Sequence, residues 1–132
     1  MSDVTVLGME EILKKLKKLP ERVQKNVLTG AIRASAKPII KEARRLVPVR
    51  SGTLKKSIGV RKRRSKDRKI IKFSIAPLSK KGGFYGMFVE NGTSKMAAHP
   101  FMRPAFEKEG KNTIKAAKEY MNKRIDKEIA KL

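Results

Sequence analysis

The chain has 132 residues, with 34 Lys and Arg against 12 Asp and Glu, which gives a formal net charge of +22. It has no cysteine, a single histidine and no apolar run near the roughly 20 residues of a membrane span, which excludes disulfides, thiol chemistry, a multi-histidine metal site and a spanning helix. The charge far exceeds the net charge of about 2–8 that keeps a small domain soluble, which points to a polyanionic partner: nucleic acid, an acidic protein surface or anionic lipid.

The first two blocks of the chain are predicted to be helical. Hydrophobic residues in 9–19 recur at helical spacing with lysines between them, which is typical of a short amphipathic helix, and Pro20 ends it. A second hydrophobic stripe covers about residues 21–46, where Gly30 and Pro38 interrupt it. Because a proline inside a helix costs about 3 kcal/mol and kinks it, we expect one bent helix or two abutting ones.

A turn-forming segment, Pro48-Val-Arg-Ser-Gly-Thr-Leu54, follows the helices. We expect Gly52 to take a positive φ, with Ser51 and Thr53 hydrogen-bonded to local backbone groups. The segment is either a tight connection, which the physics alone favours, or a docking loop. It is not a phosphate-binding loop, because it lacks the spaced glycines and the Gly-Lys-Ser/Thr ending.

A β-hairpin is predicted next, because Ile58 and Val60 alternate with polar residues and Ile71, Phe73 and Ile75 do the same. The tract between the two runs forms a basic tip. It has no aromatic residue to stack on bases and no Asn or Gln to read base edges, so a nucleic-acid contact here would be sequence-independent. Alternatively, the tract is only solvated. The candidate anion contacts are Arg61, Lys62, Arg63, Arg64, Lys66, Arg68 and Lys69.

The last block is predicted to be mainly helical. Residues 84–89 fit a helical turn or a strand, and we favour a helical turn ended by Gly92. From about Pro104, which suits the first turn of a helix, apolar residues recur every three or four positions, which predicts a long amphipathic helix that packs on the sheet. The chain is therefore expected to be a single α+β domain over residues 1–132.

Glu90 is the single acid in the aromatic-, glycine- and proline-rich stretch 84–106. A catalytic acid would need a second acid, a histidine or a cysteine nearby in the sequence, and none lies within eight residues of Glu90. We therefore predict no catalytic, metal-binding or cofactor-binding residues. Glu90 is expected to form an ion pair with Arg103 or Arg50, and His99 to lie in a loop.

Three motifs occur in order: Pro48-x-Arg-Ser-Gly-Thr-Leu, Tyr85-Gly-x-Phe-Val-Glu-x-Gly-Thr and Pro100-Phe-Met-Arg-Pro-Ala. Together they resemble the gene-product-ten-like tail component family of long-tailed double-stranded DNA phages and prophages, although Asn91 stands where an aromatic residue often follows the glutamate. The resemblance implies that these motifs form the fold signature and an assembly surface. Its residues would be Arg50, Gly52, Leu54, Tyr85, Phe88, Glu90, Gly92, Thr93, Phe101, Arg103 and Pro104.

The resemblance also implies a function. Such a protein would be a non-enzymatic virion morphogenesis protein acting in tail completion or head–tail joining. It would be present in the host cytoplasm during assembly and then in the virion neck or tail, as a homo-oligomeric ring in contact with portal, connector or tail proteins and with no membrane. Two other interpretations stay open: an independent nucleic-acid-binding protein, and an enzyme such as a nuclease, against which the lack of clustered acids and histidine argues.

Overall fold

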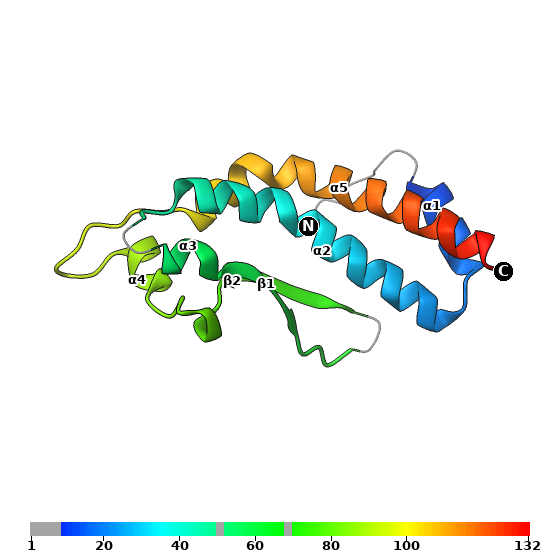
Figure 1. Ribbon diagram of the computed structural model, residues 1–132, viewed down its shortest axis with the longest axis horizontal. Coiled ribbons are helices and arrows are strands. Elements are labelled where there is room, and N and C mark those ends of the chain that lie inside the picture. Colours follow the sequence, from blue (N-terminus) through cyan, green and yellow to red (C-terminus); the bar gives the residue numbers. More distant parts are fainter. Residues whose placement is uncertain (1–8, 50–51, 68–69) are drawn as a thin grey trace. The chain divides into compact units, whose positions relative to one another are not determined.

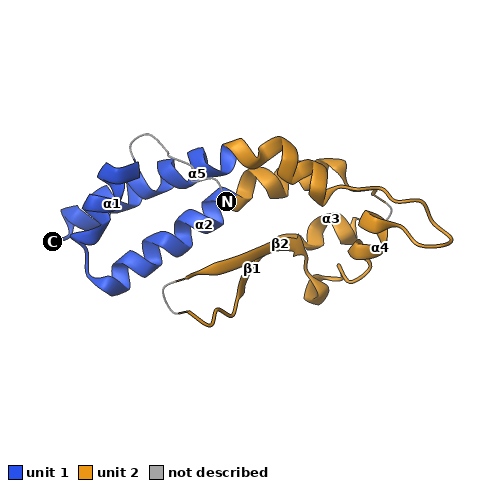
Figure 2. Cartoon of the chain, turned by 180° about the vertical axis from the view of Figure 1, so that it is seen from behind, with its two compact units in different colours: residues 1–35, 112–132 blue, residues 36–111 orange. Residues whose placement is uncertain are grey.

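The computed structural model describes residues 9–49, 52–67 and 70–132. It has an α+β fold, as predicted, with helices and a two-stranded antiparallel sheet. The chain divides into two compact units, residues 1–35 with 112–132 and residues 36–111 (Figure 2). The elements in chain order (Figure 1) are α1 (Met9–Lys17), α2 (Glu21–Leu46), α3 (Thr53–Ser57), β1 (Ile58–Arg63), β2 (Lys72–Pro77), the short 3-10 helix η1 (Ser79–Lys81), α4 (Gly86–Asn91) and α5 (Met102–Ala130).

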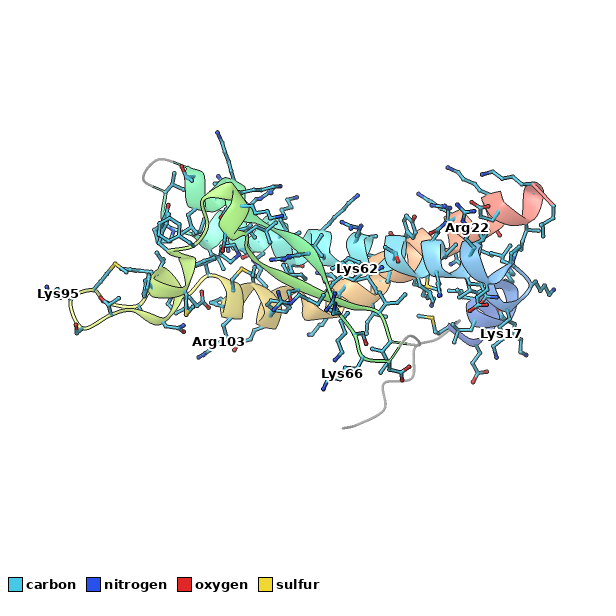
Figure 3. The ribbon with its side chains drawn as sticks, turned by 90° about the horizontal axis from the view of Figure 1, so that it is seen from below. Lys17, Arg22, Lys62, Lys66, Lys95 and Arg103 are labelled. Atoms are coloured by element: carbon cyan, nitrogen blue, oxygen red, sulfur yellow. The ribbon has the colours of Figure 1, made fainter. Side chains whose placement is uncertain are left out.

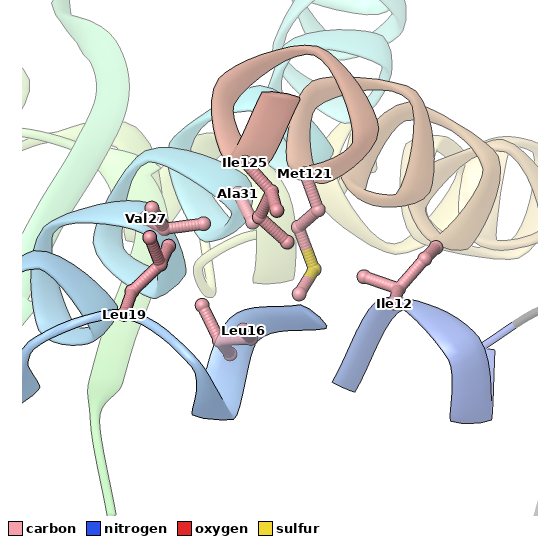
Figure 4. Packing of buried hydrophobic residues seen from close by; sticks show 7 residues of the cluster. All are labelled: Ile12, Leu16, Leu19, Val27, Ala31, Met121 and Ile125. Carbon is pink, nitrogen blue, oxygen red and sulfur yellow. The ribbon is translucent and has the colours of Figure 1, made fainter. Parts of the chain in front are cut away.

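The first unit is a helical cluster built from α1, the start of α2 and the end of α5. Ile12, Leu16 and Leu19 of the hydrophobic stripe predicted for 9–19 are buried here, whereas Leu13 is 41 % exposed. The lysines between them are exposed. Pro20 lies just before α2, and its carbonyl accepts the backbone N–H of Gln24 at 2.9 Å. Seven buried side chains form the core of the unit (Figure 4): Ile12, Leu16, Leu19, Val27, Ala31, Met121 and Ile125.

The second block is one continuous helix, α2, which runs through both Gly30 and Pro38. This settles the open choice between one helix and two. Gly30 lies where the ring of Tyr120 approaches α2 so closely that a Cβ at residue 30 would overlap the Tyr120 hydroxyl. The same hydroxyl accepts a hydrogen bond from Arg124 Nη1 at 3.0 Å. The glycine therefore makes room for a side chain of α5.

The second unit contains the sheet and the short helices. β1 and β2 pair antiparallel from Ile58 opposite Pro77 to Arg63 opposite Lys72, which confirms the predicted pairing, with Ile71 just before β2. Arg44 Nη2 of α2 donates a hydrogen bond to the Ile58 carbonyl at 3.0 Å. The buried core of this unit consists of Ile39, Ala43, Val47, Leu54, Ile58, Phe101 and Ala105.

The expectation that the long C-terminal helix packs on the sheet is correct only for its start. Ala105 belongs to the same cluster as Ile58 of β1, but Met121 and Ile125 belong to the helical cluster of the first unit. The physical reason is length. The 29 residues of α5 extend about 43 Å at 1.5 Å per residue, whereas a strand of six residues is only about 20 Å long.

Glu42 is a buried acid on α2, with 7 % of its surface exposed. Its carboxylate accepts hydrogen bonds from Arg45 and, at 3.2 Å, from Lys108 Nζ of α5. The hydrogen bond from Arg45 is the main reason why the pKa of Glu42 falls to about 2, against the opposing effect of burial and with help from Lys108. Within the second unit, this carboxylate thus holds cations from two helices together.

The helix α3 lies where a connection was expected. Gly52 precedes it with φ of +82°, as predicted, and Ser51 lies outside the described residues. Leu54 and Ser57 face inward, and the buried Ser57 hydroxyl donates to the Leu54 carbonyl at 2.6 Å. Five residues are too few for hydrophobic periodicity to indicate a helix.

Replacing Gly30 by alanine should destabilise the protein by about 1–3 kcal/mol, because the added methyl group overlaps the Tyr120 side chain. The matched control is Gly110→Ala on α5, where an added Cβ has no atom within 4 Å. There the better helix propensity of alanine should stabilise by about 0.5–1 kcal/mol. Denaturant unfolding monitored by circular dichroism measures both changes. Equal stability of the two variants would contradict the close packing of Tyr120 on Gly30.

Candidate functional site

The helix α4 is packed directly onto its own unit through its inner face. Gly86 is buried, and a Cβ there would lie 2.7 Å from Pro77 Cγ and 3.1 Å from Leu54 Cδ1. Tyr85 and Val89 pack against the core cluster of the second unit. A larger residue at position 86 would therefore push α4 away from β2 and α3.

Gly92 ends α4, as predicted, with φ of +76° and its N–H bonded to the Phe88 carbonyl at 2.8 Å. A Cβ on Gly92 would also lie 2.8 Å from the backbone nitrogen of Ala98, so a side chain is excluded for two reasons. The following loop extends away from the rest of the second unit, with Lys95 at its far end (Figure 3). It returns to α4 where the His99 N–H donates to the Val89 carbonyl at 2.8 Å.

Glu90 caps the N-terminus of α5. Its Oε2 accepts the backbone N–H groups of Phe101 at 2.7 Å and Met102 at 3.0 Å, and its Oε1 accepts that of Arg103 at 3.0 Å. These groups have no partner within the helix, and the positive end of the helix dipole attracts a carboxylate.

The surroundings of Glu90 lower its pKa. Burial acts in the opposite direction, but the three backbone hydrogen bonds and the charge of Arg103 together outweigh it. Arg103 thus contributes through its charge, while the backbone N–H groups, which the sequence did not suggest, are the hydrogen-bond partners. The alternative partner, Arg50, lies outside the described residues.

The predicted signature residues separate into interior and surface groups. Leu54 and Phe101 are buried in the core, Tyr85 is partly buried against it, and Pro104 lies in the first turn of α5. Phe88, Thr93 and Arg103 are exposed. The motifs therefore describe one corner of the second unit, in which α3, α4 and the start of α5 meet, with only part of it accessible to a partner.

The outward face of α4 is apolar. Phe84, Met87 and Phe88 are 71 %, 66 % and 52 % exposed. Met87 and Phe88 belong to α4, and Phe84 precedes them by three and four residues, two positions before the helix begins. Tyr85 and Val89, in contrast, pack against the core. The ring of Phe84 packs edge-on against that of Tyr85, with 5.7 Å between centroids. Phe84 and Met87 were not among the predicted contacts, although this spacing is visible in the sequence.

The register of the sheet shows on which of its two faces each predicted cation of the hairpin lies. Arg61 and Arg63 point to one face, and Lys72 of β2 lies opposite Arg63 on that face. All three are exposed. Lys62 points to the other face, opposite Phe73. Like charges directly opposite on two strands repel, so an anion bound on the Arg61 face would relieve this repulsion.

The remaining predicted cations lie outside the strands. Arg64 and Lys66 are exposed in the connection between β1 and β2, and Lys66 is labelled in Figure 3. Arg68 and Lys69 lie outside the described residues. Lys72 was missed because its role follows from the pairing register, which the sequence did not define.

Across the described ranges, no three His, Asp or Glu side chains are grouped so that they could hold a metal ion. No helix in those ranges has the length and apolarity to cross a membrane.

Replacing Glu90 by alanine should destabilise the protein by about 1–2 kcal/mol at pH 7, because three N–H groups at the start of α5 lose their acceptor. The control is Glu119→Ala, which removes an exposed acid of α5. Because the pKa of Glu90 is lowered in the folded protein from its ordinary 4.5, its stabilisation is complete above pH 4.5 and is lost as pH falls through the lowered value.

The difference in unfolding free energy between wild type and Glu90→Ala should therefore shrink below pH 4.5. Urea unfolding at a series of pH values measures it. A difference that stays constant down to pH 2 would contradict a capping role for the ionised carboxylate.

A family model described as "Bacteriophage HK97-gp10, putative tail-component" matches residues 10–92 of the chain. The match extends from α1 to the glycine that ends α4, so it contains the α3 and α4 motifs, and the Pro100 motif and α5 lie beyond it. No curated protein and no solved structure matched the chain. Since the model covers more than half of the 132 residues, the chain belongs to this family of bacteriophage tail components.

Proposed function

We propose that the protein is a non-enzymatic structural component of the phage head–tail junction, acting in tail completion or as a neck ring. The observation that carries this proposal is the exposed apolar face of α4 on a corner fixed by Glu90 and Gly92, in a chain that belongs to a tail-component family. Large apolar side chains held outward on a rigid element favour protein–protein contact. The partners would be further copies of the chain and portal, connector or tail proteins.

A role without bond chemistry is supported by the state of Glu90. Both of its carboxylate oxygens accept backbone N–H groups. An acceptor already engaged in this way is a poor general base, because taking a proton would break these bonds.

The protein would be made in the host cytoplasm and retained in the virion neck or tail. The continuous helices α2 and α5 contribute to both compact units, which supports a single domain over residues 1–132.

In the proposed ring, subunits related by rotation would use head-to-tail contacts. A net charge of +22 on each copy opposes this association. We therefore place the cation-rich surfaces away from the subunit contacts. The Arg61 face of the hairpin would meet a polyanion, either DNA in the channel or an acidic surface of a neighbouring protein.

Deleting the gene from the phage or prophage that encodes it should leave filled heads and separate tails, and supplying the protein in trans should restore infectious particles. Electron microscopy of the lysates and plaque counts measure both effects. A tagged copy should be located at the neck of restored particles. Intact infectious virions without the protein would contradict the proposal.

The hairpin generates a separate prediction, on duplex DNA of random sequence. Replacing Arg61 and Arg63 together by glutamine should lower the slope of log affinity against log salt by about two, because each lost phosphate contact removes about 0.9. Lys62→Gln, on the opposite face of the sheet, is the matched control and should change the slope little. Equal effects of both variants would show that the Arg61 face is not the one that contacts DNA.

A further inference from the structure

We propose that the outward face of α4, formed by Phe84, Met87 and Phe88, docks onto an acidic protein surface with an apolar centre that a different virion protein supplies. This inference rests on the proposed function and deepens it by naming the chemistry of one partner. It assigns the face to a contact between unlike proteins, distinct from the contacts between copies in a ring.

The backbone that carries this face is already fixed by contacts within the chain. The inner side of α4 is fixed by Tyr85, Gly86 and Val89, and its end by Gly92, whose N–H is bonded to Phe88. Docking would therefore order little backbone, so most of the free energy of burying the outward side chains would appear as affinity. Aromatic side chains at the centre of a contact supply much of the binding energy in protein interfaces.

The elements packed around α4 are cationic. η1 lies against α3, since a Cβ on Gly82 would approach Thr53 Cγ2 at 2.6 Å. A Cβ on Gly86, the first residue of α4, would likewise lie 3.1 Å from Leu54 Cδ1 of α3. These elements and the loop after α4 carry five exposed lysines: Lys55, Lys56, Lys80, Lys81 and Lys95. Across residues 43–100 the sequence has 16 Lys and Arg but only two acids, Asp67 and Glu90. Glu90 already caps α5, and the ion pairs found among the described residues include none of these five lysines.

This charge selects the partner. A second copy would bring lysine against lysine if it presented the same face, and it carries a net charge of +22 whichever face it presents. Like charges across an interface cost affinity and slow association. Duplex DNA would satisfy the lysines, but its outer surface of phosphate and sugar offers no apolar area to cover Phe84, Met87 and Phe88. An acidic protein surface with an apolar centre satisfies both the lysines and the apolar side chains.

The test uses heads and tails purified from particles assembled without the protein. The radiolabelled wild-type chain is mixed with each, before and after nuclease treatment, and bound protein is measured by sedimentation. The test variant is Phe84→Ser with Phe88→Ser, and it should bind at least about tenfold more weakly. Its control is Phe106→Ser with Ile114→Ser, which removes exposed apolar side chains of α5 and should bind as wild type does.

A second pair of variants tests the charge. Lys80→Glu with Lys81→Glu should also lose about tenfold or more in affinity, whereas Lys111→Glu with Lys115→Glu on α5 makes the same change in net charge and should lose less. Circular dichroism and thermal melting verify that each variant is folded, which is expected because all eight side chains are exposed.

The outcomes separate the two proposals. If wild type binds neither heads nor tails, the proposed function is wrong. If wild type binds and the α4 variants bind equally well, only this inference is wrong. It is also wrong if the α4 variants lose self-association in analytical ultracentrifugation along with particle binding, which would assign the face to a second copy. Binding that disappears on nuclease treatment would assign the contact to DNA.

Discussion

The hydrogen bonds from the start of α5 to the Glu90 carboxylate are the constraint on which the signature corner depends. A helix begins with N–H groups that lack partners inside it, and the first turn of α5 contains no acidic residue that could satisfy them locally. The acceptor comes instead from α4, eleven residues before Phe101. One side chain therefore positions α4, closes the loop between the helices and places Phe101 in the core.

This arrangement gives a physical reason for the spacing of the motifs. Gly92 must turn the chain with a positive φ two residues after Glu90, and the loop must be long enough to return to Val89 through His99. Gly86 must be small so that α4 can lie on Pro77 and Leu54. A glycine at each of these positions and an acid at position 90 are requirements of geometry. Phe84, Met87 and Phe88 meet no such requirement in the isolated chain, since all three are exposed.

Much of the fold follows from periodicity in the sequence, and the exceptions have physical causes. The helices α1, α2 and α5 and the two strands are long enough for an apolar repeat to be counted, and Gly92 indicates the end of α4. The five residues of α3 are too few to show a repeat. The hydrogen-bond partners of Glu90 are backbone groups, which carry no sequence signal. The sequence therefore predicted charged side chains, Arg103 or Arg50, as its partners instead. Lys72 joins Arg61 and Arg63 only through the register of β1 and β2.

The distribution of charge explains how so basic a chain can both fold and assemble. Two acids on the long helices each pair with two cations: Glu42 contacts Arg45 and Lys108, and Glu128 contacts Arg124 and Lys131. The segment from β1 to the loop after α4 has only two acids in its sequence, Asp67 and the engaged Glu90. Exposed pairs contribute little to stability, so this shortage of acids costs the fold little. The lysines and arginines of the segment would be attracted to any polyanionic surface within about 8 Å, the screening length in the cell. Folding thus tolerates this excess of cations, and an acidic partner or DNA would neutralise it on assembly.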